Sequence, residues 1–389
     1  MSSEKSRRDY LKYAGTAVVC GAVGAAAGFA GGQSSLPQVG PTSTVTSTVY
    51  QGGPTRIAGT PNPKSRNETL RIAGGGCSAR DDYAFGMAMY DGIQNLAKKY
   101  PNIELVSYSE PCPYADYDSI LSGALEKGID IFLGLDAGWH ESFAKIAPQY
   151  PDVWFMGTCV QIEHYYPQHT NNWFSLILWE HELGYIGGYM AGLMTKTNKV
   201  GWVGGEPYSC INGNGNAFMA AARLANPEVE CEIGWAGSFL DPSKGKELAK
   251  GMIDAGCDVL SHGADSSGLG VIAAAKEAGL LVANSGGYDA TPVAPDTVIS
   301  DARMGYREGL EAIMENYFSG TLEPKSYDYT SMHMGGVFPI GPNENIVPAD
   351  VKKKWEDEMF WAGLWSGVPR IEGSSPDWTS PLLKALYHK

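Results

Sequence analysis

The stretch ELGYIGGYMAGLMTKTNKVGWVGG, residues 182–205, contains a helix followed by a strand. Its first half carries apolar residues and glycines at helical spacing, and KVGWVGG at 199–205 is a short apolar run that ends in two glycines. The same alternation of helical segments and short apolar runs fills the chain from residue 69 onward. Such alternation predicts parallel β-sheets that are covered by helices on both faces.

These segments form two consecutive series of similar length. The first runs from TLRIAGGG at 69–76 to VWFMGT at 153–158, and the second runs from near Glu180 to LLVANSG at 280–286. We therefore expect an α/β fold of two doubly wound lobes with a central cleft. Ligands of such sheets bind beyond the carboxyl ends of the strands. The turns after RIAGGG, FLGLD, GWVGG, VLSHG and VANSG are the expected site.

The composition is that of an acidic globular protein. The 389 residues are 43% hydrophobic and 19% charged, and the formal net charge is −14 at pH 7. Proteins that bind nucleic acids present basic patches to the phosphate backbone. Lysine and arginine cluster only in the first dozen residues. We therefore expect no nucleic-acid partner.

The N-terminus has the pattern of an export signal. Arg7 and Arg8 precede an apolar run of small residues, which is typical of a twin-arginine signal. Residues 1–32 are expected to be a cleaved signal or a retained membrane anchor, and the sequence leaves both alternatives open. Residues 33–66 are rich in Ser, Thr, Pro and Gly and are expected to form an extended tether. The body of the protein is therefore expected outside the cytoplasm, tethered to the cell membrane.

The glycine-rich segment NGNGNAF raises the question of a phosphate-binding loop. Dinucleotide loops have the form G-x-G-x-x-G directly after a strand, and triphosphate loops have GxxxxGK followed by Ser or Thr. Gly213 and Gly215 fit neither pattern. We expect instead a turn that presents the side chains of Asn212 and Asn214 to a neutral solute, and we expect no cofactor.

No arrangement of residues predicts catalysis or a metal centre. GADSSGLG comes nearest to a nucleophile elbow, but its spacing differs from G-x-S-x-G. Cys159 stands near His164 after an apolar strand, where a disulfide or a buried thiol is the simpler interpretation. His164, His169 and His181 lack the HExxH spacing of a helical zinc site. We expect a protein that is not an enzyme.

Three segments carry a resemblance to a known family. They are the opening stretch, GSFLDPSKGKELAKGMIDAGCDVLSHGADSSGLGVIAAAKEAG at 237–279 and GGVFPIGPNENIVPADVKKKWEDE at 335–358. Their order and spacing resemble the basic membrane protein family, over roughly residues 69 to 360. These proteins are extracytoplasmic solute receptors of ABC transporters, and the characterised members mostly bind purine nucleosides.

The resemblance implies the fold of type I periplasmic binding proteins, with three crossovers between the lobes. We expect these near 175–178, near 295–298 and near Pro324. The expected first lobe comprises 67–177 plus 298–323, and the expected second lobe comprises 178–297 plus 324–370. Residues 371–389 form an extension with no assigned function. Ligand contacts across the cleft favour the closed form, which an ABC permease then recognises.

The resemblance also implies a set of ligand contacts, of which this chain keeps only some. The family's first-lobe motif D-x-S-F-N corresponds to DYAFG, so that Asp82 and the stacking Phe85 are kept and Gly86 replaces a base-contacting Asn. Asn214 stands where a second stacking aromatic residue is expected. Ser285 stands where an acid holds the ribose hydroxyls.

Other residues are candidates to replace the lost contacts. A purine needs two flat faces and a ribose needs a carboxylate or an amide pair. Tyr208, Trp139 or Tyr288 is the candidate for the missing face, and Asp136 or Asp265 for the missing acid. The full set of candidate ligand-binding residues is Asp82, Tyr83, Phe85, Asp136, Trp139, Tyr208, Asn212, Asn214, Asp265, Ser285 and Arg303, the last in place of a family lysine.

Several candidates have a structural alternative that the sequence leaves open. Asp82 is equally suited to cap the helix that follows it. Phe85 is placed either in the cleft or in the core, and Trp139 either at the cleft rim or against a helix end. Arg303 is as well suited to an ion pair between the lobes as to ligand binding.

The cysteines suggest one disulfide. Cys77 follows the first strand and Cys112 follows the second, and adjacent parallel strands bring such ends together. We predict a Cys77–Cys112 bridge, although spacing alone does not determine connectivity.

The sequence thus predicts a monomeric receptor that delivers a nucleoside-like solute to an ABC permease. The alternatives are a sensor of the same fold that signals to a membrane partner, and a receptor for a solute of another class.

Overall fold

The structure is a computed structural model that describes residues 58–365 except 179, 331 and 333–335. The predicted signal (1–32), most of the predicted tether and the predicted extension (371–389) lie outside the described residues. Among the residues described, no helix is both long enough and apolar enough to cross a membrane.

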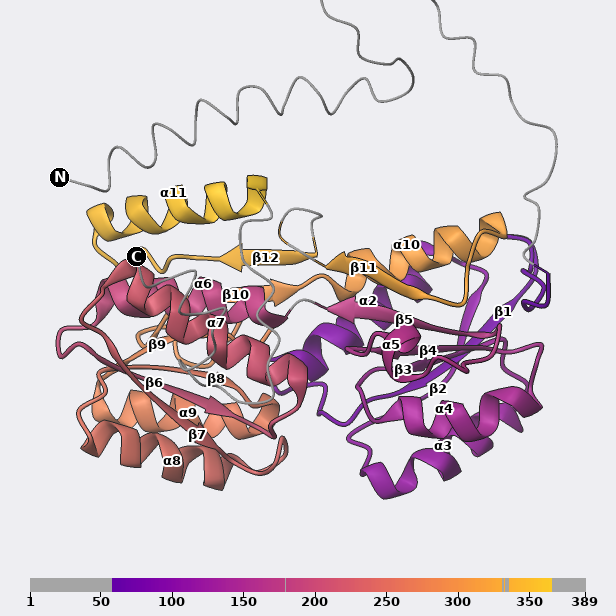
Figure 1. Cartoon of the computed structure of the whole chain (residues 1–389), viewed down its shortest axis with the longest axis horizontal. Helices are drawn as coiled ribbons and strands as arrows, with labels where there is room; N and C mark the ends of the chain where they lie inside the picture. The colour runs from indigo at the N-terminus through magenta and orange to yellow at the C-terminus, as the bar shows by residue number, and fades with distance from the viewer. Residues whose placement is uncertain (1–57, 179, 331, 333–335, 366–389) are drawn as a thin grey trace, which may run out of the picture. The chain divides into compact units, whose positions relative to one another are not determined.

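The first lobe is built on a six-stranded parallel sheet in the order β11-β5-β4-β3-β1-β2. Helices cover both of its faces, and Figure 1 shows α3 and α4 on the side opposite α2 and α10. The elements are β1 (Leu70–Gly75), α2 (Phe85–Lys99), β2 (Ile103–Ser109), α3 (Tyr117–Leu125), β3 (Ile131–Gly134), α4 (Trp139–Ile146), β4 (Trp154–Thr158), α5 (Ile162–Tyr165), β5 (Trp173–Leu178), α10 (Tyr306–Ser319) and β11 (Ser326–Thr330), with one-turn 3₁₀ helices η1 (Tyr114–Asp116) and η2 (Ala147–Gln149).

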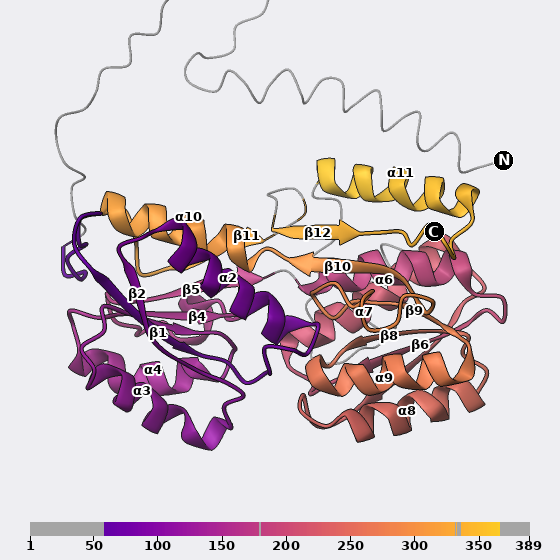
Figure 2. The same ribbon diagram turned by 180° about the vertical axis from the view of Figure 1, so that it is seen from behind.

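The second lobe repeats this plan with the sheet order β12-β10-β9-β8-β6-β7. All of its pairings are parallel except that of β10 with β12. Figure 2 shows α8 and α9 beneath this sheet and α6 above it. The elements are α6 (Glu180–Met194), β6 (Lys199–Gly204), α7 (Ser209–Ala225), β7 (Glu230–Trp235), α8 (Pro242–Asp254), β8 (Val259–Gly263), α9 (Asp265–Ala278), β9 (Leu281–Ala283), β10 (Val298–Met304), β12 (Val337–Ile340) and α11 (Ala349–Trp365). The α/β fold of two lobes is therefore confirmed.

Two crossovers differ from the predicted boundaries. The sequence assigned 298–323 to the first lobe, but β10 pairs with β9 and β12 in the second sheet. The sequence assigned 324–330 to the second lobe, but β11 pairs with β5 in the first sheet. The chain therefore crosses after β10 and again after β11. Periodicity identifies a strand but not its neighbours, which is why these two strands were misplaced.

The glycine-rich segment after β6 is helical and not a turn. Helix α7 begins at Ser209 and includes all of NGNGNAF. Glycine disfavours helix interiors, but a side chain at Gly215 would put its Cβ 2.9 Å from the ring of Trp202. Close packing against the sheet thus accounts for glycine at this position. We had expected a turn because glycine is so common in turns.

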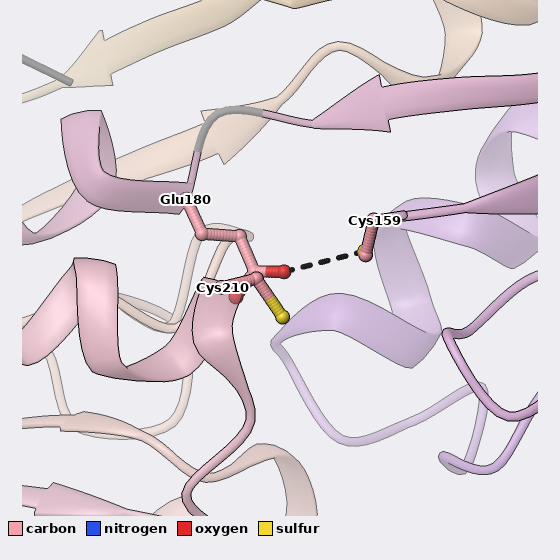
Figure 3. Close-up of side chains that lie close together, drawn as sticks. All are labelled: Cys159, Glu180 and Cys210. Atoms are coloured by element: carbon pink, nitrogen blue, oxygen red, sulfur yellow. Dashed lines mark hydrogen bonds between the residues drawn. The ribbon is translucent and has the colours of Figure 1, made fainter. Parts of the chain in front are cut away.

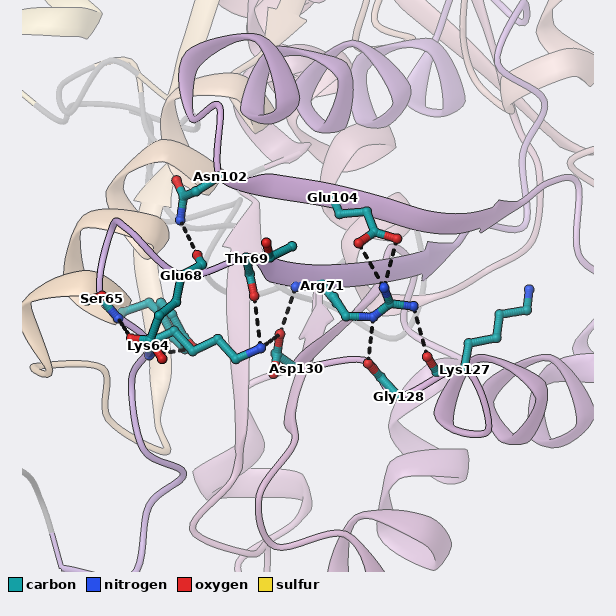
Figure 4. Close-up of polar contacts among 11 residues, drawn as sticks. Lys64, Ser65, Glu68, Thr69, Arg71, Asn102, Glu104, Lys127, Gly128 and Asp130 are labelled. Carbon is teal, nitrogen blue, oxygen red and sulfur yellow. Dashed lines mark hydrogen bonds and ion pairs between the residues drawn. The ribbon is translucent and has the colours of Figure 1, made fainter.

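Residues 58–66, which we had assigned to the tether, are bound to the first lobe. Lys64 donates to the carbonyl of Thr69 at 2.9 Å and to the carboxylate of Asp130 at 2.6 Å, as Figure 4 shows. The same carboxylate accepts from the backbone amide of Arg71 at 2.7 Å. Arg66 forms an ion pair with Glu315 on α10 at 2.5 Å. These contacts hold the entry of the chain against β1, so the described part of the predicted tether is not extended away from the lobe.

Candidate functional site

A cavity lies between the two lobes, at the carboxyl ends of the strands. The lining residues of the first lobe follow β1, β2, β3 and β4. Those of the second lobe lie shortly before, or in the first turn of, the helices that follow β5, β6, β7 and β8. This is where doubly wound sheets bind ligands. The lining residues are Cys77, Phe85, Tyr114, Asp136, Ala137, Cys159, Glu180, Tyr208, Cys210, Ile211, Phe239 and Asp265.

The lobes touch each other around this cavity. The Ser78 hydroxyl of the first lobe donates to the carboxylate of Asp265 in the second. The backbones of Ala84 and Gly287 form a β-bridge across the lobes. The cavity volume is about 40 Å³, whereas small-molecule pockets typically measure about 300–1,000 Å³. A solute of that class therefore needs the lobes to separate, or the lining rings to turn, before it enters.

Two predicted aromatic residues line the cavity from opposite lobes. Phe85 opens α2 and meets Tyr306 edge to face at 5.3 Å between ring centroids. Tyr208 precedes α7 and lies parallel to Phe239, with centroids 6.2 Å apart. Tyr114 of the first lobe meets Tyr208 edge to face at 6.4 Å. Aromatic faces from both lobes thus surround the space where a flat solute would lie.

Two predicted acids line the cavity, together with a third that the sequence analysis missed. Asp136 accepts from the backbone amide of Gly138 at 2.7 Å, and burial raises its pKa to about 6. Burial raises the pKa of Asp265 well above its usual range. Burial also raises the pKa of Glu180, the first residue of α6, to about 7. The described lining residues include no lysine or arginine, so the cavity disfavours anionic solutes.

Asp82 lies outside the cavity and fixes the start of α2. Its carboxylate accepts from the backbone amides of Ala84, Gly86 and Met87 at 2.8–2.9 Å. Asp82 thus caps the helix, which is the structural alternative to ligand binding that the sequence left open. A Cβ at Gly86 would lie 2.3 Å from the carbonyl oxygen of Ala79, so this turn has no room for the asparagine of the family motif.

Asn214 and Ser285 are buried within the second lobe and bond to the same indole. The Trp202 Nε1–H donates to Asn214 Oδ1 at 3.3 Å and to Ser285 Oγ at 3.2 Å. Asn214 Nδ2 also donates to the carbonyl of Ser285 at 3.0 Å. Asn212 donates to the carbonyl of Pro207 at 3.2 Å. Asn212, Asn214 and Ser285 are therefore not among the residues that line the cavity.

Trp139, Tyr83 and Arg303 also lie outside the cavity lining. Trp139 is fully buried in the first lobe and stacks on Tyr117 with centroids 3.9 Å apart, so it lies in the core and not at the cleft rim. Tyr83, with a φ of 51°, packs against the apolar core of the second lobe. Arg303 on β10 forms a bidentate ion pair with Glu308 on α10, at 2.8 and 3.0 Å. That pair joins the lobes, as the structural alternative for Arg303 predicted.

The predicted Cys77–Cys112 disulfide is not formed. Both residues carry free thiols. Cys112 donates to the carbonyl of Ser109 at 2.9 Å, and Cys77 lies 3.4 Å from the hydroxyl of Ser78. The two thiols thus have different partners, although their strands are adjacent.

The sequence analysis also missed several lining residues that share one position in the fold. Tyr114 comes shortly after β2 and Phe239 shortly after β7, and the expected site included only the turns after β1, β3, β6, β8 and β9. Cys159 follows β4, and we had interpreted it as a disulfide partner or a buried thiol. Extending the strand-end rule to every strand of both series would have found these residues.

A larger hollow of about 320 Å³ lies on the first lobe alone, beside α4 and α5. The ring nitrogens of His169 there lie 2.8 and 3.0 Å from the carbonyl oxygens of Tyr166 and Pro324. Its lining residues include no acid and come from one lobe only. The cavity between the lobes, by contrast, gathers acids and aromatic rings from both lobes and is the candidate site.

Comparison with known proteins agrees with this geometry. A family model described as "ABC transporter substrate-binding protein PnrA-like", of the Bmp family, matches residues 77–358, which is more than half of the chain. The chain belongs to the Bmp family. It is therefore a substrate-binding protein of the ABC-transporter type, from a family that acts outside the cytoplasm in transport and not as an enzyme.

Curated relatives of this Bmp protein carry different ligand names. A putative ABC transporter glucose-binding protein of Haloferax volcanii is 25% identical over 314 residues, which cover 80% of this chain and 69% of the relative. An ABC transporter nucleoside-binding protein of Lactococcus lactis is 27% identical over 199 residues, 50% of this chain and 55% of the relative. The chain thus spans only about half the length of the second relative.

Solved structures share the fold. A solute-binding protein of an ABC transporter system from Conexibacter woesei has a TM-score of 0.61 at 20% identity, over 79% of this chain and all of that one. A transcriptional activator of the comK gene from Bacillus halodurans has a TM-score of 0.63 at 20% identity, over 77% and 99% of the two chains.

Proposed function

We propose that this Bmp protein is the receptor of an ABC importer for a neutral, hydroxyl-rich solute. A purine nucleoside is the first candidate and a hexose the second. The receptor would be an exported, tethered monomer that closes on the solute and delivers it to the permease.

One observation carries this proposal. Four aromatic rings and three buried carboxyl groups line a single cavity between the lobes, and the described lining includes no basic side chain. Aromatic faces stack on a base or on the apolar face of a sugar ring. Carboxylates accept hydrogen bonds from hydroxyl groups. The same carboxylates disfavour a phosphate group, so a nucleoside fits this cavity better than a nucleotide.

Because this chain departs from the family's nucleoside motif, its residues favour a class of solute and not a single compound. Gly86 has no side chain to offer a base, and Asn214 and Ser285 point into the second lobe. Asp136, Glu180 and Asp265 are left to bind hydroxyl groups. The glucose-binding and nucleoside-binding names of the relatives are both compatible with such a site.

A thermal-shift screen of the full-length protein tests the proposal. Nucleosides, free bases, hexoses, amino acids and nucleotides would each be added at millimolar concentration. A micromolar ligand then raises the free energy of unfolding by about 4 kcal/mol through mass action. We expect a shift with nucleosides or hexoses and none with nucleotides. A shift with amino acids or nucleotides alone would contradict the assigned solute class.

Two variants link that shift to the cavity. Phe85→Ala removes a ring that lines it, and we expect the ligand-induced shift to be lost. Phe360→Ala, at an exposed position on α11, should keep the shift. An undiminished shift in Phe85→Ala would place the solute elsewhere.

A solute sensor is the second candidate function. A transcriptional activator protein of Bacillus subtilis is 24% identical over 277 residues, and the comK activator shares the fold. Both candidates predict solute binding, but only a receptor stimulates the ATPase of a reconstituted permease. That measurement separates them.

A further inference from the structure

Two thiols and a carboxylate meet at one end of the cavity, and they come from different lobes. Cys159 follows β4 in the first lobe, whereas Glu180 opens α6 and Cys210 lies in the first turn of α7 in the second. Figure 3 shows the three side chains pointing toward one another. One ligand atom from each, the two Sγ atoms and a carboxylate oxygen, lie within 4.8 Å of one another.

We propose that Cys159, Glu180 and Cys210 form a zinc site that holds the closed lobes together. This site goes beyond the proposed solute and competes with it, because all three residues line the same cavity. The sequence analysis expected no metal because it considered motifs of closely spaced ligands, and these three residues are far apart in the chain.

The distances fit tetrahedral zinc. Zn–S bonds of about 2.3 Å and Zn–O bonds of about 2.0 Å place a sulfur and an oxygen about 3.5 Å apart on a tetrahedron. Cys159 Sγ lies 3.5 Å from Glu180 Oε1. Two sulfurs on the same tetrahedron are about 3.8 Å apart, and the two Sγ atoms lie within 4.8 Å of each other.

The surroundings favour a cation. Glu180 is buried, with 4% of its surface exposed, and Asp136 and Asp265 line the same cavity. A buried carboxyl group keeps its proton unless it is paired with a cation or bound to a metal. The described lining offers no lysine or arginine to pair with it. A divalent cation would satisfy the carboxylate and both thiolates together.

The cavity leaves room for a fourth ligand. Three protein ligands with an open fourth position are typical of zinc sites that hold a water. The cavity volume of about 40 Å³ exceeds the roughly 10–15 Å³ that a water molecule needs on the same measure. Because Cys159 belongs to one lobe and the other two ligands to the other, the bound ion would oppose separation of the lobes.

Cobalt substitution tests the site on the reduced, metal-stripped full-length protein without solute. We expect one Co²⁺ per chain, a near-ultraviolet thiolate-to-cobalt band, and displacement of that band by Zn²⁺. Cys159→Ser and Cys210→Ser should each lose the band. Glu180→Gln should weaken Co²⁺ binding by at least the roughly 10–100-fold that loss of an outer-shell partner costs.

Cys257→Ser is the matched control, because Cys257 is a buried free cysteine that belongs neither to the cavity lining nor to the three-residue cluster. It should bind Co²⁺ like the parent. Thermal unfolding without metal checks that every variant is folded. A thiolate band that persists in Cys159→Ser plus Cys210→Ser, or a reduced parent that gives no band, would overturn the proposal.

A disulfide between Cys159 and Cys210 is the competing outcome. Thiol titration of the air-exposed, denatured protein detects it. If that bridge forms and the reduced protein binds no Co²⁺, the zinc site is refuted. The titration uses no solute and the solute screen uses no metal, so failure of one proposal is told apart from failure of the other.

Discussion

Asp301 is a fully buried acid whose ionisation bears on stability. Its carboxylate accepts from the Asn284 side chain at 3.0 Å and from the backbone amides of Ala290 and Ala302 at 2.7 Å. Burial nevertheless raises its pKa to about 8. These bonds join β10 to the loop after β9, and that loop carries the Gly287 backbone that touches the first lobe.

We predict that stability falls as pH rises toward about 8, and that Asp301→Asn reduces this fall. The folded state holds a proton on Asp301 that the unfolded state, with a pKa near 3.9, has released, so the free energy of unfolding decreases with pH. One such proton contributes up to about 1.4 kcal/mol per pH unit. Urea unfolding between about pH 6.5 and 8 measures the slope.

The lower limit of that window avoids an opposing effect. Burial lowers the pKa of His140 and of His262 to about 4, so these residues make stability rise with pH until their unfolded pKa of about 6.5 is passed. Burial also raises the pKa of Glu182 to about 8. Part of the fall of stability with pH therefore remains in Asp301→Asn. Glu356→Gln, on the exposed side of α11, serves as the control. An unchanged slope in Asp301→Asn would refute the prediction.

The sequence located some site residues and not others for a physical reason. Asp136, Tyr208 and Asp265 come shortly after strand ends, which hydrophobic periodicity locates, whereas the resemblance to the family motif implied Phe85. Asn214 is also close to such an end, but its side chain turns toward the indole of Trp202. That direction depends on the packing of a strand against a helix, which no local pattern encodes.

Helix α6 packs on α7 through glycines spaced four residues apart. Gly184, Gly188 and Gly192 lie on one face of α6. An added Cβ would lie 1.9 Å from the carbonyl oxygen of Asn214 at Gly184, and 2.2 Å from that of Phe218 at Gly188. These contacts are with backbone atoms, which cannot rotate away. The glycines therefore set the separation of the two helices.

We predict that Gly188→Ala destabilises the protein by about 1–3 kcal/mol or more, as overpacking of a close contact does. Gly251→Ala is the matched control, because an added Cβ there meets no described atom within 4 Å in α8. Helix propensity should make that variant up to about 1 kcal/mol more stable. Urea unfolding compares both with the parent. Equal stability of Gly188→Ala and the parent would show that the helices are farther apart than described.

Whether a segment forms a helix or a strand was easier to predict than which strands pair with each other. The alternation of apolar runs and helical segments predicted both sheets, because each run is buried on both faces. The same runs do not tell which sheet β10 or β11 joins, since that depends on where the chain crosses between the lobes. Residues 58–66 were misassigned for a similar reason. Their composition is that of a linker, but Lys64 and Arg66 find acidic partners on distant elements.

At the scale of the whole molecule, the proposed function depends on the balance between closed and open lobes. The described contacts between the lobes include two polar ones, Ser78 with Asp265 and Arg303 with Glu308, beside the packing of Tyr83 on the core of the second lobe. In a receptor the open and closed forms need similar free energies, because a ligand shifts their equilibrium only by its differential affinity for the two forms. Removing one contact should therefore change solute affinity without changing the solute's own contacts.

Ser78→Ala tests this balance. In the closed form the variant leaves the buried Asp265 carboxyl without the Ser78 hydroxyl, whereas water reaches that carboxyl when the lobes separate. A buried polar group that loses its partner costs about 1–3 kcal/mol, and 1.4 kcal/mol corresponds to tenfold in an equilibrium. We expect solute affinity to fall about tenfold and the radius of gyration of the unliganded protein, measured by X-ray scattering, to increase. Ser319→Ala, at the exposed end of α10, should change neither quantity. Parent-like values of both in Ser78→Ala would mean that this hydrogen bond does not hold the lobes closed.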